Sequence, residues 1–145
     1  MNTTRSSCPP SFRTFGLAVQ AMVVLANNEQ NCPSCILAEK LQSEASLMRK
    51  IMAQLARAGL IETREGRDGG YRLSRPASSI KLSEIYTALY IGTEMCRAIG
   101  DAAGNHPFGL KMKAAFDGLA AELEESMLDV LSKHTVAEYV DQAFS

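Results

Sequence analysis

Two cysteines separated by two residues, Cys32 and Cys35, are the side chains of this sequence best suited to redox chemistry. They flank Pro33 at the predicted start of a helix, where free N–H groups and the helix dipole favour a thiolate and lower its pKa. An exposed thiolate is readily oxidised to a sulfenic acid and then to a disulfide, and closure within this pair is one possible disulfide. A thioredoxin-like enzyme is disfavoured because no βαβ pattern surrounds the pair.

The remaining thiols and imidazoles do not have the spacing of a metal site. Tetrahedral zinc would require Cys96 and His106 to converge with the first two cysteines, and an iron–sulfur cluster generally takes four protein ligands, mostly thiolates. We therefore predict no metal and no cofactor, and keep a cluster that draws ligands from two subunits as an alternative. No Ser/His/Asp set and no paired carboxylates stand out, so the chain is not predicted to be an enzyme.

Basic side chains gather in the middle of the chain, although the net charge of the whole sequence is −1. Residues 46–75 contain seven Lys or Arg against three Asp or Glu, whereas residues 121–141 contain one Lys against six Asp or Glu. This separation suggests that the middle of the chain meets phosphate groups and that the acidic end has a different role.

The basic region begins with the pattern of two short helices joined by a tight turn. Apolar residues at helical spacing predict helices over 34–41 and 45–58, with a polar turn at 42–44 and a stop at Gly59. Ser43 is predicted to cap the second helix. The predicted buried side of the first helix consists of Ile36, Leu37, Ala38 and Leu41.

The second of these helices has one apolar and one polar face. Its predicted buried side consists of Met48, Ile51, Met52 and Leu55. Ser46, Arg49 and Lys50 remain on the other side, where the first turns of a reading helix enter the major groove of DNA. An arginine there can bind a guanine edge with two hydrogen bonds. A solvated helix face would show the same charges, so the segment that follows decides between the two interpretations.

That segment is a predicted hairpin with a glycine-rich turn. Runs typical of strands at 60–64 and 71–74 enclose a turn that contains Gly66, Gly69 and Gly70, as a turn with positive φ angles requires. Arg67 at its tip is placed to reach the backbone or minor groove of DNA. Two helices followed by a hairpin are typical of a winged helix-turn-helix, which reads DNA. Arg13, near the start of an earlier helix, is a further candidate for a phosphate contact.

The whole chain is predicted to be mainly α-helical with a small β wing. Residues 1–10 are predicted to be a disordered leader that contains Cys8, residues 11–80 the winged helix-turn-helix domain, and residues 81–145 a linker and dimerisation helices. No apolar run approaches the ~20 residues that span a bilayer, and the first residues lack the apolar core of a secretory signal. A cytoplasmic protein without a membrane partner is therefore expected.

The C-terminal third is predicted to contain one long helix. Helices are expected at 82–91, 108–133 and 136–143, with a polar linker at 92–107. The apolar side of the long helix consists of Leu110, Met112, Phe116, Leu119, Leu123, Met127, Val130 and Leu131. A stripe of this length cannot be buried by a small winged-helix head alone, so we expect the helix to pair with a second copy of the chain.

The segments ILAEKL, LMRKIMAQLARAGLIETREG, GGYRLSRP and IKLSEIYTALY resemble, in this order, the winged-helix transcription regulators of the IscR/NsrR/CymR family. The resemblance covers residues 12–89 well and the remainder loosely. It implies a homodimer that binds double-stranded DNA at a palindromic operator, usually as a repressor, and that pairs through its long C-terminal helix. Many members hold an iron–sulfur cluster on three closely spaced cysteines, whereas the corresponding region here has only Cys96.

The family also contains regulators that sense oxidation through thiols. We therefore expect a thiol switch in which Cys32 forms a disulfide with Cys96 of the partner subunit, with Cys35 as an alternative partner for Cys32. Such a bond would move the two reading heads relative to each other. The alternatives are a regulator that senses an iron–sulfur cluster or a small ligand, and a winged-helix module that binds proteins and never DNA.

Overall fold

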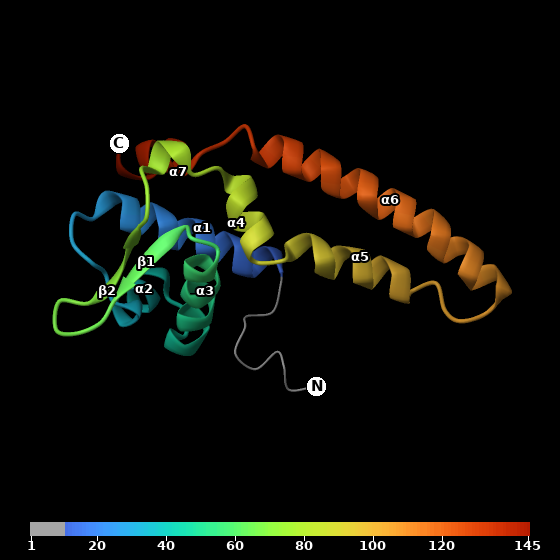
Figure 1. Ribbon diagram of the computed structural model, residues 1–145, viewed down its shortest axis with the longest axis horizontal. Helices are drawn as coiled ribbons and strands as arrows, with labels where there is room; N and C mark the ends of the chain where they lie inside the picture. Colours follow the sequence, from blue (N-terminus) through green and yellow to red (C-terminus); the bar gives the residue numbers. More distant parts are fainter. Residues whose placement is uncertain (1–10) are drawn as a thin grey trace.

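The computed structural model describes residues 11–145, except for the side chains of residues 93–95. The prediction of a disordered leader with Cys8 lies outside the described residues. The described elements follow in the order α1 (Phe12–Asn27), α2 (Ser34–Leu41), α3 (Ala45–Arg57), β1 (Ile61–Arg64), β2 (Gly70–Leu73), the 3-10 turn η2 (Ala77–Ser79), α4 (Leu82–Ala88), α5 (Ile91–Asp101), α6 (Pro107–Leu131) and α7 (Val136–Phe144). Figure 1 shows a head formed by the first helices and the hairpin, from which α5 and α6 extend as an arm.

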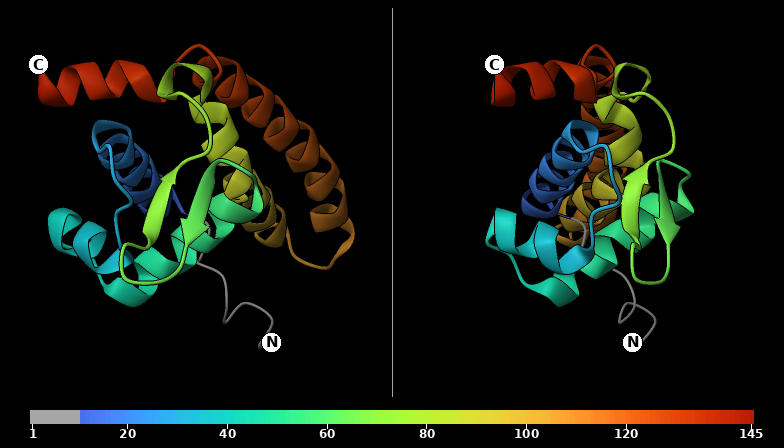
Figure 2. Two further views of the ribbon diagram at one scale, coloured as in Figure 1. Left: turned by 60° about the vertical axis from the view of Figure 1, so that its left-hand side comes forward. Right: turned by 90° about the vertical axis from the view of Figure 1, so that its left-hand side faces the viewer.

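The head is built around one apolar core through which α1 runs. α1 contacts α2, α3, α4, α7 and β2, so elements from both ends of the chain share its surface (Figures 1 and 2). The largest fully buried side chains are Met22, Leu37, Met48, Ile51, Met52, Leu55, Leu60, Ile80, Ile85, Tyr86, Leu89 and Ile91. The predicted apolar face of α3 is thus completely buried, and the mainly α fold with a small β wing is confirmed.

The ends of the early helices agree only in part with the sequence. Ser11 caps α1, and its hydroxyl accepts a hydrogen bond of 3.1 Å from the Thr14 N–H. Ile36 is 39% exposed, so it does not belong to the buried side of α2 as predicted. The prediction that Ser43 caps α3 is wrong: Glu44 occupies that position and makes no side-chain cap. The Ser43 hydroxyl is instead buried, without a hydrogen-bond partner in the described part of the chain.

The wing is a two-stranded antiparallel hairpin whose register runs from Ile61 opposite Leu73 to Arg64 opposite Gly70. Its second strand gains a further partner in the loop between α1 and α2. The Cys32 N–H donates to the Tyr71 carbonyl at 3.0 Å, and the Tyr71 N–H donates to the Cys32 carbonyl at 2.9 Å. This pair of bonds attaches the wing to the start of α2.

Most of the linker predicted at residues 92–107 is a helix in the structure, so that prediction is wrong. α5 covers residues 91–101, and only a short turn separates it from α6. Gly92 and Gly100 both lie within α5 and are buried. A Cβ atom at Gly92 would clash with the Glu124 carboxylate of α6, so the glycine leaves room for this side chain between the two helices.

The long helix predicted near the C-terminus is confirmed as α6, and α7 follows it as a short helix. The His106 Nδ1 atom caps α6 by accepting a hydrogen bond of 3.0 Å from the Gly109 N–H. α6 contacts α5 and α4 along one side, and its other side is open to solvent. No described helix is both long and apolar enough to cross a lipid bilayer.

Candidate nucleic-acid interface

The first turns of α3 present polar side chains on the face opposite the core. Ser46 and Arg49 are exposed and Lys50 is half-buried, as predicted from the helical spacing. Neither Arg49 nor Lys50 forms an ion pair with another described residue within 4.0 Å. Because Glu44 makes no side-chain cap, the first N–H groups of α3 are also left to external partners. This face can therefore meet an anionic partner without first breaking internal contacts.

The wing turn lies on the same edge of the head as the N-terminal end of α3 in both views (Figures 1 and 2). Arg67 is exposed within this turn, beside Gly66, whose φ of +105° places it in the left-handed region. The Asn31 side-chain amide donates to the Asp68 carbonyl at 3.0 Å and holds the turn against the loop before α2. The structure therefore brings Arg67 and the polar face of α3 to one edge of the molecule.

Arg13 and the remaining basic residues are arranged differently. Arg13 is exposed in the first turn of α1, which Figure 1 shows on the opposite side of the head from the wing turn. Arg72 pairs with Glu62 across the wing at 3.0 Å, and Arg75 pairs with Glu84 of α4. The basic residues counted in the sequence thus include two that serve internal ion pairs.

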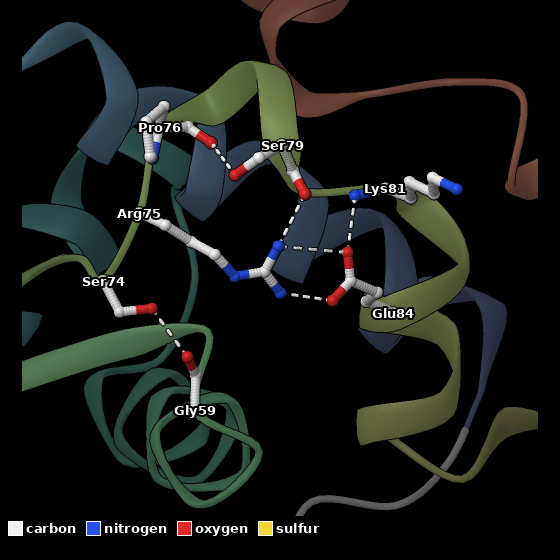
Figure 3. A network of polar contacts seen from close by, with 7 residues as sticks. All are labelled: Gly59, Ser74, Arg75, Pro76, Ser79, Lys81 and Glu84. Carbon is white, nitrogen blue, oxygen red and sulfur yellow. Dashed lines mark hydrogen bonds and ion pairs between the residues drawn. The ribbon is translucent and has the colours of Figure 1, made fainter.

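The Arg75–Glu84 pair is the centre of a polar network that fixes the end of the wing to α4 (Figure 3). The guanidinium donates to the Glu84 carboxylate and to the Ser79 carbonyl, and the Lys81 N–H donates to the same carboxylate at 3.0 Å. Burial acts to raise the pKa of Glu84, but the hydrogen bonds from Arg75 and Lys81 outweigh burial and hold the pKa below its ordinary value. The carboxylate is therefore ionised and satisfied near neutral pH.

The three described cysteines are free thiols in different surroundings. Cys32 is 2% exposed, Cys35 is exposed in the first turn of α2, and Cys96 is half-buried on α5. Burial raises the pKa of the Cys32 thiol, although the Lys40 charge and a hydrogen bond from Asn28 act in the opposite direction. The expected lowering of the Cys32 pKa by the helix terminus is therefore wrong, because this thiol is buried. It lies where the backbone of Cys32 pairs with that of Tyr71 in the wing, a contact called the joint below.

No group of three His, Cys, Asp or Glu side chains that could hold a metal ion is present in residues 11–145 as described. Cys96 and His106, the two candidates of the cluster region, lie on α5 and at the start of α6. His106 already uses its Nδ1 atom to cap α6. The residues described in one chain do not fit an iron–sulfur cluster, which takes mostly thiolate ligands.

A contact that sequence reasoning missed joins α4 to α6. The Tyr86 hydroxyl donates to the Glu124 carboxylate at 3.1 Å, and the Tyr86 ring meets Phe15 of α1 edge-on. Burial, the hydrogen bond and charge of Glu124, and the nearby Cys96 raise the pKa of Tyr86 to about 12. The sequence offered no signal for this contact, because Glu124 is one of several acidic residues on α6.

Known proteins are similar to this chain in sequence and in fold. The chain is 27% identical to the HTH-type transcriptional regulator IscR of Klebsiella pneumoniae over 128 residues, which cover 86% of this chain and 75% of that protein. It is 48% identical to IscR of Cereibacter sphaeroides over 42 residues, or 29% of this chain and 27% of that protein. In the first curated relatives found, the matched segment spans about half of the relative's length or less.

The solved structure of T. potens IscR has the same fold, with a TM-score of 0.64 and 23% identity over 90% of this chain and 85% of that chain. The family named Rrf2, described as an iron-dependent transcriptional regulator, matches residues 13–142. That match covers almost all of the sequence, from the first turn of α1 into α7. The chain therefore belongs to the Rrf2 family of transcriptional regulators.

Proposed function

We propose that this chain is a cytoplasmic, homodimeric repressor that binds a palindromic DNA operator. The observation that carries the proposal is the polar face of α3 beside the wing turn, where Arg49 and Lys50 form no ion pair with another described residue. Arg49 and Lys50 are proposed to contact bases or phosphates in the major groove, with Ser46 beside them, and Arg67 to contact the backbone or minor groove. Arg13 is proposed to touch a phosphate at the far side of the head.

The exposed side of α6 supports the dimer. Its large apolar side chains that remain open to solvent are Phe108, Leu110, Leu119, Leu123 and Val130. Leu119, Leu123 and Val130 recur at helical spacing and form one stripe. A soluble protein rarely leaves such a stripe uncovered, and a second copy of the same helix would cover it with matching shape.

Within this dimer we keep oxidation as the proposed signal. Cys35 is exposed, and its thiolate would attack a peroxide oxygen to give a sulfenic acid. The Cys32 thiol then attacks this sulfenic sulfur, forms a Cys32–Cys35 disulfide and releases the oxygen as water. In a thiol–disulfide exchange, the thiolate of Cys96 of the partner subunit attacks the Cys32 sulfur, which forms the proposed Cys32–Cys96 bond and releases Cys35 as a thiolate. Because Cys32 is buried in its joint with Tyr71, its oxidation requires this joint to open and thereby disturbs the wing.

Non-reducing gel electrophoresis after peroxide treatment tests the disulfide. The wild type is expected to run as a dimer, and Cys32→Ser and Cys96→Ser as monomers. A wild type that stays monomeric under every oxidising condition contradicts an intersubunit bond. A dimer band that disappears only in Cys35→Ser would assign the bond to Cys35 and contradict the proposed pair.

Alanine variants of the reading face test DNA binding. Arg49→Ala and Lys50→Ala are expected to weaken binding, with a loss of about 1–3 kcal/mol for a residue that contacts a base. A residue that contacts only phosphate should instead reduce the slope of log Kd against log salt by about one. Lys133→Ala is the matched control, because Lys133 is an exposed cation of the turn after α6 that pairs with Asp129. Equal affinities for all variants would favour a winged-helix module that binds proteins.

A further inference from the structure

A cleft of about 620 Å³ lies between the C-terminal half of α3, the helix α4 and the C-terminal end of α6. Its apolar lining comes from Leu60 at the base of the wing, Ala88 of α4 and Leu128 of α6, with the ring of Tyr90 at one side. Gln54 of α3 and Ser132 after α6 add polar atoms. This volume falls within the roughly 300–1,000 Å³ of typical small-molecule sites, and a mostly apolar lining with a few polar groups is their usual chemistry.

Of the charged side chains that line the cleft, the one that is not already paired with a described residue carries a positive charge. Two charged side chains, Arg57 and Glu84, line it. Glu84 is already satisfied by the Arg75 guanidinium and the Lys81 N–H, as Figure 3 shows. Arg57 forms no ion pair with another described residue. An anionic group in the cleft would therefore find an unused guanidinium, whereas a cation would have to displace Arg75 from Glu84.

The cleft is separate from the surface proposed for dimerisation. At roughly 100° per residue, Leu128 and Ser132 lie on the side of α6 opposite to Leu119, Leu123 and Val130. A partner helix on the apolar stripe would therefore leave the cleft open.

We infer that this cleft is a binding site for a small amphipathic anion. The apolar body of such a molecule lies between Leu60, Ala88 and Leu128, and its carboxylate, sulfonate or phosphate group pairs with Arg57. The bound molecule contacts the reading helix, α4 and α6 together. Gln54 already links two of these elements, because its side-chain amide donates to the Ala88 carbonyl at 3.3 Å. A ligand that fits only one arrangement of the three helices would bias the position of α3.

The site is tested with two dyes that share an apolar skeleton. The anionic dye is 1-anilinonaphthalene-8-sulfonate, and the neutral dye is N-phenyl-1-naphthylamine. Fluorescence titration of the wild type is expected to show saturable binding of one anionic dye per chain. Arg57→Gln should raise the Kd of the anionic dye roughly two- to fivefold and leave that of the neutral dye unchanged, since an exposed ion pair is lost. Leu128→Trp should fill the cleft and abolish binding of both dyes.

Phe108→Ser is the control for dye bound to exposed apolar side chains of α6, because Phe108 is 70% exposed and lies outside both the cleft and the proposed dimer stripe. It is expected to leave saturable binding unchanged. The inferred site is contradicted if the wild type shows no saturable binding, if Phe108→Ser removes it, or if Arg57→Gln binds both dyes as the wild type does. Arg57 is exposed on the last turn of α3, so this variant remains informative even if Leu128→Trp fails to fold.

A role of the site in regulation rests on the proposed DNA-binding function and is tested separately. On a duplex selected by the wild type, saturating anionic dye is expected to weaken binding, because Arg57 lies on the same face of α3 as Ser46 and Lys50. By linkage, DNA must weaken dye binding by the same factor. If the dye binds and the affinity for DNA stays unchanged, only the regulatory role is contradicted. If the wild type binds no duplex even in the absence of dye, the proposed DNA-binding function is contradicted.

Discussion

At the scale of single residues, the joint between Cys32 and Tyr71 connects the proposed thiol trigger to the wing. Gly70 permits this joint, because a Cβ atom there would lie 2.5 Å from the Cys32 carbonyl carbon. Its φ of +134° is also rare for other residues. The same close approach buries the thiol and raises its pKa. One glycine therefore influences the position of the wing and the reactivity of the cysteine.

Gly70→Ala is expected to lower the free energy of unfolding by about 1–3 kcal/mol, because backbone atoms must move to admit the methyl group. Gly118→Ala is the matched control. Gly118 lies in α6, and no atom lies within 4 Å of the place that an added methyl group would take, so the change should stabilise the protein by about 0.5–1 kcal/mol. Urea unfolding of both variants measures the difference. A Gly70→Ala protein as stable as the wild type would show that the backbones at Gly70 and Cys32 are not in close contact.

The raised pKa of Tyr86 makes the free energy of unfolding depend on pH in the alkaline range. Its pKa of about 12 in the folded chain exceeds the ordinary value of 10, so the folded state holds the phenol proton more tightly than the unfolded state. The resulting stabilisation is complete below pH 10 and is lost as the pH rises from 10 to 12. Between these values the wild type should lose stability more steeply than Tyr86→Phe. Parallel curves of unfolding free energy against pH would contradict the proposed environment of the hydroxyl.

At the scale of elements, the sequence predicted α3 well because one residue pattern determines both of its faces. The four residues at helical spacing became its core, and the polar residues between them remained outside. α5 could not be predicted in the same way. Gly92 and Gly100 reduce its helical propensity, and the side chain that occupies the space beside Gly92 is that of Glu124, which is 32 residues away in the sequence. The joint of Cys32 with β2 is likewise a tertiary contact that no local pattern encodes.

Ser43, in the turn between α2 and α3, and Ser11, the N-cap of α1, allow a direct comparison of two serine hydroxyls. Ser43→Ala is expected to leave the free energy of unfolding unchanged or slightly higher, because the buried hydroxyl has no partner in the described structure. Ser11→Ala should cost about 1 kcal/mol, since its hydroxyl caps α1. Chemical denaturation measures both. A loss at Ser43 as large as that at Ser11 would mean that the Ser43 hydroxyl is satisfied after all.

At the scale of the whole molecule, the head and the arm have different surfaces. The head buries the core and presents the polar face of α3, whereas α6 leaves an apolar stripe open along the arm. The contacts of Tyr86 with Glu124 and of Phe15 with Tyr86 connect the two parts through α4. A change in how two arms pair could therefore reach the reading heads through packed side chains.

Introducing charge into the stripe tests the dimer. Leu119→Glu combined with Leu123→Glu is expected to give a monomer, because carboxylates would be buried without partners in the interface. Light scattering coupled to size-exclusion chromatography measures the mass. Ala121→Glu is the control, because it adds a charge to the opposite, exposed side of α6 and should leave a dimer. A wild type that elutes as a monomer would rule out the proposed homodimer.

Two copies of this chain are proposed to read DNA together, and selection from a random duplex pool tests this proposal most directly. The reduced wild type is expected to enrich one inverted repeat whose half-sites are separated by about 10 base pairs or a multiple of that spacing. Arg49→Ala should relax the preference at one position in each half-site. If selection enriches no sequence, and the affinity of the protein for DNA varies with salt concentration but not with sequence, the proposed reading of an operator by two copies is contradicted.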